Sequence, residues 1–155
     1  MNWNPLVPEL TISNYKKSID FYVDIIGFEI KYKRSNPDFA YLEFESSQIM
    51  IEEYHNDGWE TGRLEHPYGR GINLQIECSD VEKLQKRILN NKYAIFRNIN
   101  ENWYDTGNDF VGNKEFLVQD PDGYLLRFSE DLRTKKNAKR YCKKEIFNEN
   151  NDTNR

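Results

Sequence analysis

The sequence predicts an α+β fold built from two tandem modules, each with the order strand, helix and three strands. This order of predicted elements occurs twice along the chain. In addition, Asn14–Lys17 aligns with Asp80–Lys83 at a shift of 66 residues. Each module is too small to bury its sheet alone, so the two are expected to pack together around a shared core. We expect one domain over 1–132, with modules at about 5–54 and 71–131.

The first module begins with alternating residues over 6–12, a pattern typical of a strand. Because proline cannot donate to a β-ladder, Pro8 indicates that this strand starts at a sheet edge or crosses between subunits. Ser13 or Asn14 can cap the helix that follows, whose apolar residues recur at helical spacing until Gly27. Three short strands are then expected, over residues 28–33, 39–45 and 48–54.

The second module begins with strict alternation over 72–78, which predicts a half-buried strand. Ser79 and Glu82 have the spacing of a capping box, so Ser79 is the expected cap of the second helix. Asp120–Gly123, with the sequence Asp-Pro-Asp-Gly, predicts a tight turn between the last two strands. The three strands of this module are expected at about 93–99, 113–119 and 124–130.

Residues 55–70 separate the modules as a polar loop with three glycines and one proline. Loops of this length in a compact domain are usually functional or mobile. Trp59 lies within the loop, where it can cover a cleft or anchor the loop on its solvent side. The sequence pattern leaves both roles open.

Alternation along the strands separates a helix-facing side from a second side that mixes aromatic and polar groups. A solvated face would carry few large aromatics, and a core would carry no Glu or Arg. The mixture is typical of a concave ligand cleft, and a subunit interface would have a similar composition, so both interpretations stay open. The residues expected on this second side include Phe39, Tyr41, Glu43, Asn73, Gln75, Glu77, Leu125, Arg127 and Ser129.

The charge distribution is uneven. Residues 133–155 carry eight Lys or Arg and three Asp or Glu, a net charge of +5. Residues 1–132 carry 14 Lys or Arg and 23 Asp or Glu, a net charge of −9. An acidic body repels nucleic acid and attracts cations, although acidity also serves solubility. The basic, Asn-rich segment 133–155 is expected to be a mobile tail, with nucleic-acid binding as the less favoured alternative.

Composition excludes several further classes. Cys78 and Cys142 cannot make a disulfide framework, and His55 and His66 leave little material for a metal site. No apolar run approaches the roughly 20 residues of a membrane span, and no charged-then-apolar signal opens the chain, so the cytoplasm is the expected location. Cys78 is expected on the helix side of its strand, as a core residue and not a nucleophile.

Several motifs together resemble the vicinal oxygen chelate superfamily, which includes glyoxalase I, and more closely the bleomycin resistance proteins. They are "LVPEL" (6–10), "SIDFYVDIIGFEI" (18–30), "FAYLEF" (39–44), "IMIEE" (49–53), "RGINLQIE" (70–77) and "LVQDPDGYLLRF" (117–128). The resemblance covers residues 5–132. It implies the glyoxalase/bleomycin resistance fold, with a half-open barrel-like cleft and an N-terminal strand exchanged in a homodimer at Pro8.

In the enzymes of this superfamily, a divalent metal is held by His, Gln or Glu on the cleft faces. The corresponding positions here are Val7, Asn73 and Arg127, with Glu52 as the one remaining carboxylate. An apolar side chain and a cation do not suit a metal site, so we expect no bound metal and no cofactor. No catalytic residue is assigned either, because Glu52 and Glu53 are adjacent and face opposite sides of a strand.

The resemblance therefore implies a binding protein, not an enzyme: a cytoplasmic homodimer that sequesters a bleomycin-like antibiotic and gives antibiotic resistance. Such a drug has a planar aromatic tail and a cationic end, which aromatic walls and negative potential attract. Val111 stands where the family often has Trp, which reduces the stacking area. The expected ligand-binding residues are Phe39, Glu52, Trp59, Asn73, Trp103, Phe110, Val111, Gly112 and Arg127. Two alternatives are a superfamily enzyme of the lyase or isomerase type acting on another small molecule, and a cleft filled by the partner subunit.

Overall fold

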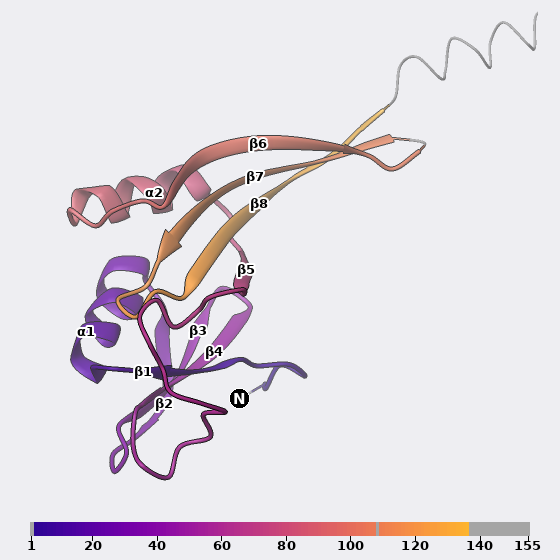
Figure 1. The fold of residues 1–155 in the computed structure, drawn as a ribbon. Coiled ribbons are helices and arrows are strands. Elements are labelled where there is room, and N and C mark those ends of the chain that lie inside the picture. The colour runs from indigo at the N-terminus through magenta and orange to yellow at the C-terminus, as the bar shows by residue number, and fades with distance from the viewer. Residues whose placement is uncertain (1, 108, 137–155) are drawn as a thin grey trace, which may run out of the picture.

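The computed structural model describes residues 2–107 and 109–136, and two modules are visible in it (Figure 1). The elements of module one are β1 (Glu9–Ile12), α1 (Tyr15–Ile19), η1 (a π-helix, Asp20–Ile26), β2 (Glu29–Arg34), β3 (Phe39–Phe44) and β4 (Ser47–Glu53). The elements of module two are β5 (Asn73–Glu77), α2 (Val81–Asn90), β6 (Arg97–Asp105), β7 (Asp109–Gln119) and β8 (Leu125–Lys136).

Within the described residues the strands form two four-stranded mixed sheets with matching topology, β1-β4-β3-β2 and β5-β8-β7-β6. The first strand of each module pairs in parallel with the last, and the other neighbours are antiparallel. This confirms the predicted tandem βαβββ architecture. β1 pairs with β4 of its own chain, Glu9 opposite Met50, and its exchange between two subunits stays a prediction.

Each helix begins at an acceptor side chain in extended backbone. Asn14 Oδ1 accepts from Lys17 N at 2.9 Å, and Asp80 Oδ1 accepts from Lys83 N at 2.9 Å. The prediction that Ser79 caps α2 is therefore wrong by one residue. Ser79 instead donates its N–H and hydroxyl to the Glu45 carboxylate of module one, which leaves the cap position to Asp80. Gly27 ends the first helical segment with φ 107°, as its position predicts.

The modules share one core between their helices and sheets, as the alternation predicts. Phe44 of module one meets Phe128 of module two with ring centroids 5.7 Å apart at 73°. Cys78, Leu126 and Phe128 are all buried in this core, on the helix side of their strands. α2 also meets η1, where Arg87 donates to the Asp24 carbonyl at 2.8 Å. Burial of this continuous apolar surface is the main force that holds the two modules together.

A buried polar seam adds to the shared core. It is formed by the β7–β8 turn, which reaches the helical segment of module one. The Tyr22 hydroxyl donates to Asp120 Oδ2 at 2.9 Å, and Asp122 Oδ2 accepts from Ser13 N at 3.1 Å. Burial raises the pKa of the Asp120 carboxyl to about 6 and raises the pKa of the Tyr22 hydroxyl well above its usual value. The predicted Asp-Pro-Asp-Gly turn thus also joins the modules.

The last three strands differ from the predicted bounds. β6 starts at Arg97, because residues 93–96 instead turn back from α2, with Tyr93 N donating to Ile88 O at 3.2 Å. β7 and β8 continue into a long ribbon that extends away from module one (Figure 1), with Asp109 paired to Lys136. Residues 133–136 therefore belong to the sheet. The rest of the predicted tail lies outside the described residues. None of the described helices is long and apolar enough to cross a membrane.

Candidate functional site

The site is built on the two sheet faces that point away from the helices, called here the concave faces of module one and module two. On module one, β3 and β4 place Phe39 opposite Glu52 and Glu43 opposite Gln48. Because side chains alternate along a strand, Tyr41 lies on the same face between Phe39 and Glu43. The predicted mixture of aromatic and polar groups is therefore present on this face.

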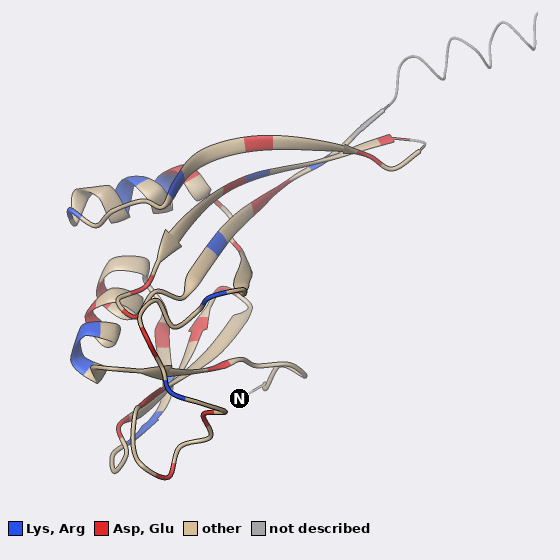
Figure 2. Cartoon of the chain, in the orientation of Figure 1, with Lys and Arg blue, Asp and Glu red and all other residues tan. Residues whose placement is uncertain are grey.

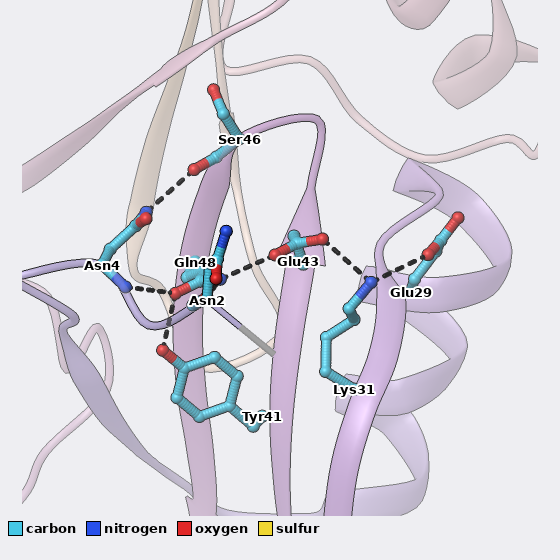
Figure 3. Close-up of polar contacts among 8 residues, drawn as sticks. All are labelled: Asn2, Asn4, Glu29, Lys31, Tyr41, Glu43, Ser46 and Gln48. Atoms are coloured by element: carbon cyan, nitrogen blue, oxygen red, sulfur yellow. Dashed lines mark hydrogen bonds and ion pairs between the residues drawn. The ribbon is translucent and has the colours of Figure 1, made fainter.

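The N-terminal arm, residues 2–8, lies against the concave face of module one. Trp3 meets Tyr41 edge-on, with ring centroids 4.5 Å apart at 81°. Asn4 donates its N–H to Gln48 Oε1 and its side-chain amide to the Ser46 carbonyl, both at 2.8 Å (Figure 3). The predicted hinge residue Pro8 ends the arm, and its carbonyl accepts from Met50 N at 2.8 Å.

A polar network under the arm is centred on Gln48, which is only 5% exposed. Gln48 Oε1 accepts from the Tyr41 hydroxyl at 2.7 Å, and Gln48 Nε2 donates to Glu43 at 2.6 Å and to the Asn2 carbonyl at 2.8 Å (Figure 3). Lys31 pairs with Glu43 at 2.9 Å. The hydrogen bond from Gln48, followed by the one from Lys31, lowers the pKa of the Glu43 carboxyl. This part of the face is filled and satisfied by the chain's own groups.

Next to the network, Arg34 lies over the predicted aromatic wall. The Arg34 guanidinium carbon is 4.0 Å from the Phe39 ring centroid. The same guanidinium pairs with one oxygen of Glu52 at 2.5 Å, and His55 Nε2 lies 3.0 Å from the other oxygen. Burial, and then the charge of Glu52, raise the pKa of the nearby Glu9 carboxyl, while Arg34 lowers it.

The concave face of module two holds a cleft of about 320 Å³. It is formed by residues of β5, β7 and β8 together with Tyr104 near the end of β6. Its lining combines carboxylates and amides with one aromatic wall: Gln75, Glu77, Tyr104, Val111, Gly112, Asn113, Ser129 and Asp131. This is the second face that the alternation predicts, and here it is hollow.

Of the predicted site residues on the β6–β7 pair, Val111 and Gly112 line this cleft, whereas Trp103 and Phe110 do not. Trp103 lies opposite Gly112, and Tyr104 lies opposite Val111. A Cβ on Gly112 would come within 2.5 Å of the Trp103 ring, so only glycine allows this close approach. Phe110 lies one residue further along β7, opposite Asp105. Because side chains alternate along a strand, the Trp103 ring lies on the face of the ribbon opposite Tyr104 and outside the cleft.

Arg127 lies on the same face of β8 and is held by module-two groups. It donates to Gln75 Oε1 at 2.6 Å, and its guanidinium is 3.7 Å from Glu115. Two buried atoms here, Asn113 Oδ1 and Arg127 Nε, have no hydrogen-bond partner in the part of the chain that the structure describes. A buried polar atom without a partner is costly, so a ligand that satisfies it gains affinity.

Two more predicted residues lie elsewhere. Trp59 is 93% exposed in the loop between the modules and lines neither concave face. Asn73 lines a separate hollow beside the Asp-Pro-Asp-Gly turn, together with Gln119 and Leu125. The sequence prediction missed Tyr104 and Asp131 because it ended β6 and β8 too early. Asn113 begins the predicted strand 113–119 but was not assigned to the site, and periodicity gave no signal there because residues 113–115 are all polar.

The residues at the implied metal-ligand positions do not fit a divalent ion. Val7 has no donor atom, and Glu52 is engaged by Arg34 and His55. Arg127 places a guanidinium where a carboxylate would be needed. Among the described residues, no group of three or more His, Cys, Asp or Glu side chains is arranged to hold a metal. No step through a metal is therefore derived for this chain.

The paired βαβββ sheets and their mixed concave faces define the class of fold. A family model described as "Glyoxalase/Bleomycin resistance protein/Dioxygenase superfamily" matches residues 6–128. The chain belongs to this superfamily, and its fold is the glyoxalase/bleomycin resistance fold.

Individual relatives carry different names. "Bleomycin resistance protein" of Geobacillus stearothermophilus is 24% identical over 83% of this chain and 97% of its own length. "Lactoylglutathione lyase" of Neisseria meningitidis is 25% identical over 77% of this chain and 84% of its own length. The solved integron cassette protein of V. cholerae is 18% identical, with a TM-score of 0.60 over 84% of this chain and 97% of its own. Superfamily membership therefore includes both a resistance protein and an enzyme.

Proposed function

We propose that this chain is a metal-free binding protein that sequesters a planar, cationic, bleomycin-like antibiotic and so gives resistance to it. The cleft on the concave face of module two is the observation that carries the proposal. Glu77 and Asp131 line this cleft and give it negative potential, and Tyr104 supplies a flat wall. Acidic residues also lie on strands of both modules (Figure 2), which favours approach of a cation from solution.

The unpartnered Asn113 Oδ1 adds a directional feature to this cleft. An amide oxygen without a partner accepts an N–H, and its own Nδ2 already donates to Glu115 at 3.1 Å. A ligand with amide, amidine or ammonium donors fits this arrangement better than an anion.

The complete site is proposed to lie between two copies of the chain in a cytoplasmic homodimer. One protomer contributes Phe39 and Glu52, and the other contributes the module-two cleft with Val111 and Gly112. The cleft of module two is open on one side, and a 320 Å³ hollow is small for a large drug. Pairing with a second sheet would enclose more of the ligand. Val111 provides less stacking surface than a Trp, so the ligand need not be bleomycin itself.

Titration of the full chain with metal-free bleomycin, followed by tryptophan fluorescence and calorimetry, tests the proposal. We expect saturable binding with one drug per protomer and a Kd of about 1 µM or lower. The drug should be recovered chemically unchanged. The absence of binding to bleomycin and to related flat cationic drugs would refute the sequestration role. Sedimentation at the same concentrations tests the homodimer independently.

Lactoylglutathione lyase activity is the competing function, because a lyase matches the chain at a similar identity. Val7 and Arg127 argue against it, since an apolar side chain and a cation at ligand positions do not fit a divalent ion. Incubation with lactoylglutathione and an added divalent metal, together with metal analysis of the purified protein, separates the two functions. Stoichiometric metal with turnover would establish the enzyme in place of the binding protein.

A further inference from the structure

On module one, Phe39 and Glu52 hold the guanidinium of Arg34, and this place is called here the Arg34 seat. Its side chains are those of a ligand subsite. Phe39 forms its floor, and Tyr32 lies beside that ring with centroids 6.0 Å apart. Glu52 forms its acidic wall and is held on its far oxygen by His55 at 3.0 Å. The occupant is the guanidinium of Arg34, 4.0 Å above the ring. An aromatic face with a carboxylate at its edge recognises a flat cation with N–H donors in the plane.

The Arg34 side chain is the part of the seat that another group can displace most easily. Arg34 is the last residue of β2, and its side chain is 46% exposed, whereas Phe39 is 4% exposed. A partly exposed ion pair contributes little net stability, because solvent competes for both charges. The guanidinium can therefore leave the ring at small cost when another flat cation takes its place.

We propose that Phe39 and Glu52 form a subsite for a guanidinium or amidinium group, and that Arg34 is its internal competitor. The inference rests on the proposed function and deepens it by naming the cationic group that the site recognises. Binding of such a group exchanges one guanidinium for another, so Arg34 sets the apparent affinity. Apparent affinity is reduced by the fraction of molecules in which the seat is already filled.

Calorimetric titration with benzamidine, a flat aryl amidinium, tests the subsite. R34A is expected to bind benzamidine about tenfold more tightly than the wild-type chain, because the competitor is gone. R34Q, which keeps a polar side chain of intermediate length, is expected to gain as well. Adding F39L or E52Q to R34A should remove the gain, since each deletes one wall of the seat.

K33A is the matched control. Lys33 precedes Arg34 on β2 but pairs with Ala40 and so lies on the opposite face of the strand. K33A removes the same charge from the chain and should leave benzamidine affinity unchanged. Benzamide, the neutral flat analogue, should gain nothing from R34A. Equal gains for K33A, or for benzamide, would overturn the proposal, and so would the lack of any gain in both R34A and R34Q when both remain folded.

Failure of the subsite and failure of the sequestration role give different results. If bleomycin binds the wild-type chain but benzamidine gains nothing from R34A, the subsite is wrong and sequestration stands. If R34A gains benzamidine affinity but no drug binds, the subsite stands and sequestration is wrong.

Discussion

The two modules have the same topology, yet their concave faces are in opposite states. On module one the chain covers its own face: Trp3 lies against Tyr41, and Arg34 lies over Phe39. On module two the corresponding face is hollow and contains two buried polar atoms without a partner among the described residues, Asn113 Oδ1 and Arg127 Nε. The βαβββ topology therefore creates the concave faces, and the N-terminal arm together with single side chains such as Arg34 decides whether a face is open.

The contacts between the modules show a second asymmetry. Each module extends the turn before its last strand toward the start of the other module's helix. From module one, Glu45 accepts from Ser79 at an exposed position. From module two, Asp122 accepts from Ser13 N, and Asp120 of the same turn accepts from the buried Tyr22 hydroxyl. The corresponding turns thus connect the modules once at an exposed position and once through buried carboxylates. The buried Tyr22–Asp120 contact contributes far more to stability and to its pH dependence.

The largest effect on stability is expected at the buried contact between Tyr22 and Asp120. Burial raises the pKa of Asp120 from 3.8 to about 6, so the folded chain keeps a proton that the unfolded chain has released. The Asp120 contribution to stability is complete below about pH 4 and is lost as pH rises through about 6. By linkage this loss is about 3 kcal/mol. Urea denaturation across this range should show the slope in wild type and a weaker slope in D120N. Equal slopes would contradict the assignment.

The filled face of module one should depend on Gln48 far more than the open face depends on Asn113. Q48A leaves the buried Tyr41 hydroxyl and the Asn4 N–H without their acceptor, and we expect a loss of about 2 kcal/mol. N113A deletes an amide that already lacks one partner, so its cost should be about 0.5 kcal/mol. Urea unfolding at one pH measures both variants. Similar losses of stability in Q48A and N113A would show that the two concave faces depend equally on their polar side chains.

The β6–β7 pairing carries Tyr104 and Val111, one wall of the module-two cleft, and it depends on the close approach of Trp103 to Gly112. A Cβ at Gly112 forces the Trp103 ring or the strand that carries it to move, so G112A should weaken drug binding by about tenfold, measured by calorimetry. G62A is the control, because nothing lies within 4 Å of a Cβ at Gly62. If G112A binds the drug as tightly as wild type, the β6–β7 pair does not form a wall of the ligand site.

The smallest effect on stability is expected at the exposed contact between Ser79 and Glu45. E45A removes the acceptor of the Ser79 hydroxyl and N–H, and solvent can replace it, so the loss should be about 0.5 kcal/mol. Thermal unfolding of E45A beside D120N measures the contrast between the two connections. If E45A loses nearly as much stability as D120N, the exposed and the buried contacts between the modules contribute equally.

Local signals in the sequence predicted the site only where a single strand carries the information. Alternation placed Phe39, Tyr41 and Glu43 on one face. It also separated Glu52 from Glu53, which accepts from Tyr15 N at 2.8 Å on the helix side. The placement of Arg34 over Phe39 was not predicted, because β2 and β3 could pair in several registers. Ser79 and Asp80 are both good caps, and a contact with Glu45, 34 residues earlier, decided between them.

The sequence by itself determined the repeated βαβββ order, the turns, and which side of each strand is apolar, because these follow from backbone preferences and from spacing along a few residues. The tertiary structure alone decided that one concave face is covered and the other open, and that one connection is buried. Those outcomes depend on contacts between segments that are far apart in the chain. Their energies come from burial and from the pairing of polar groups, which no local pattern of residues encodes.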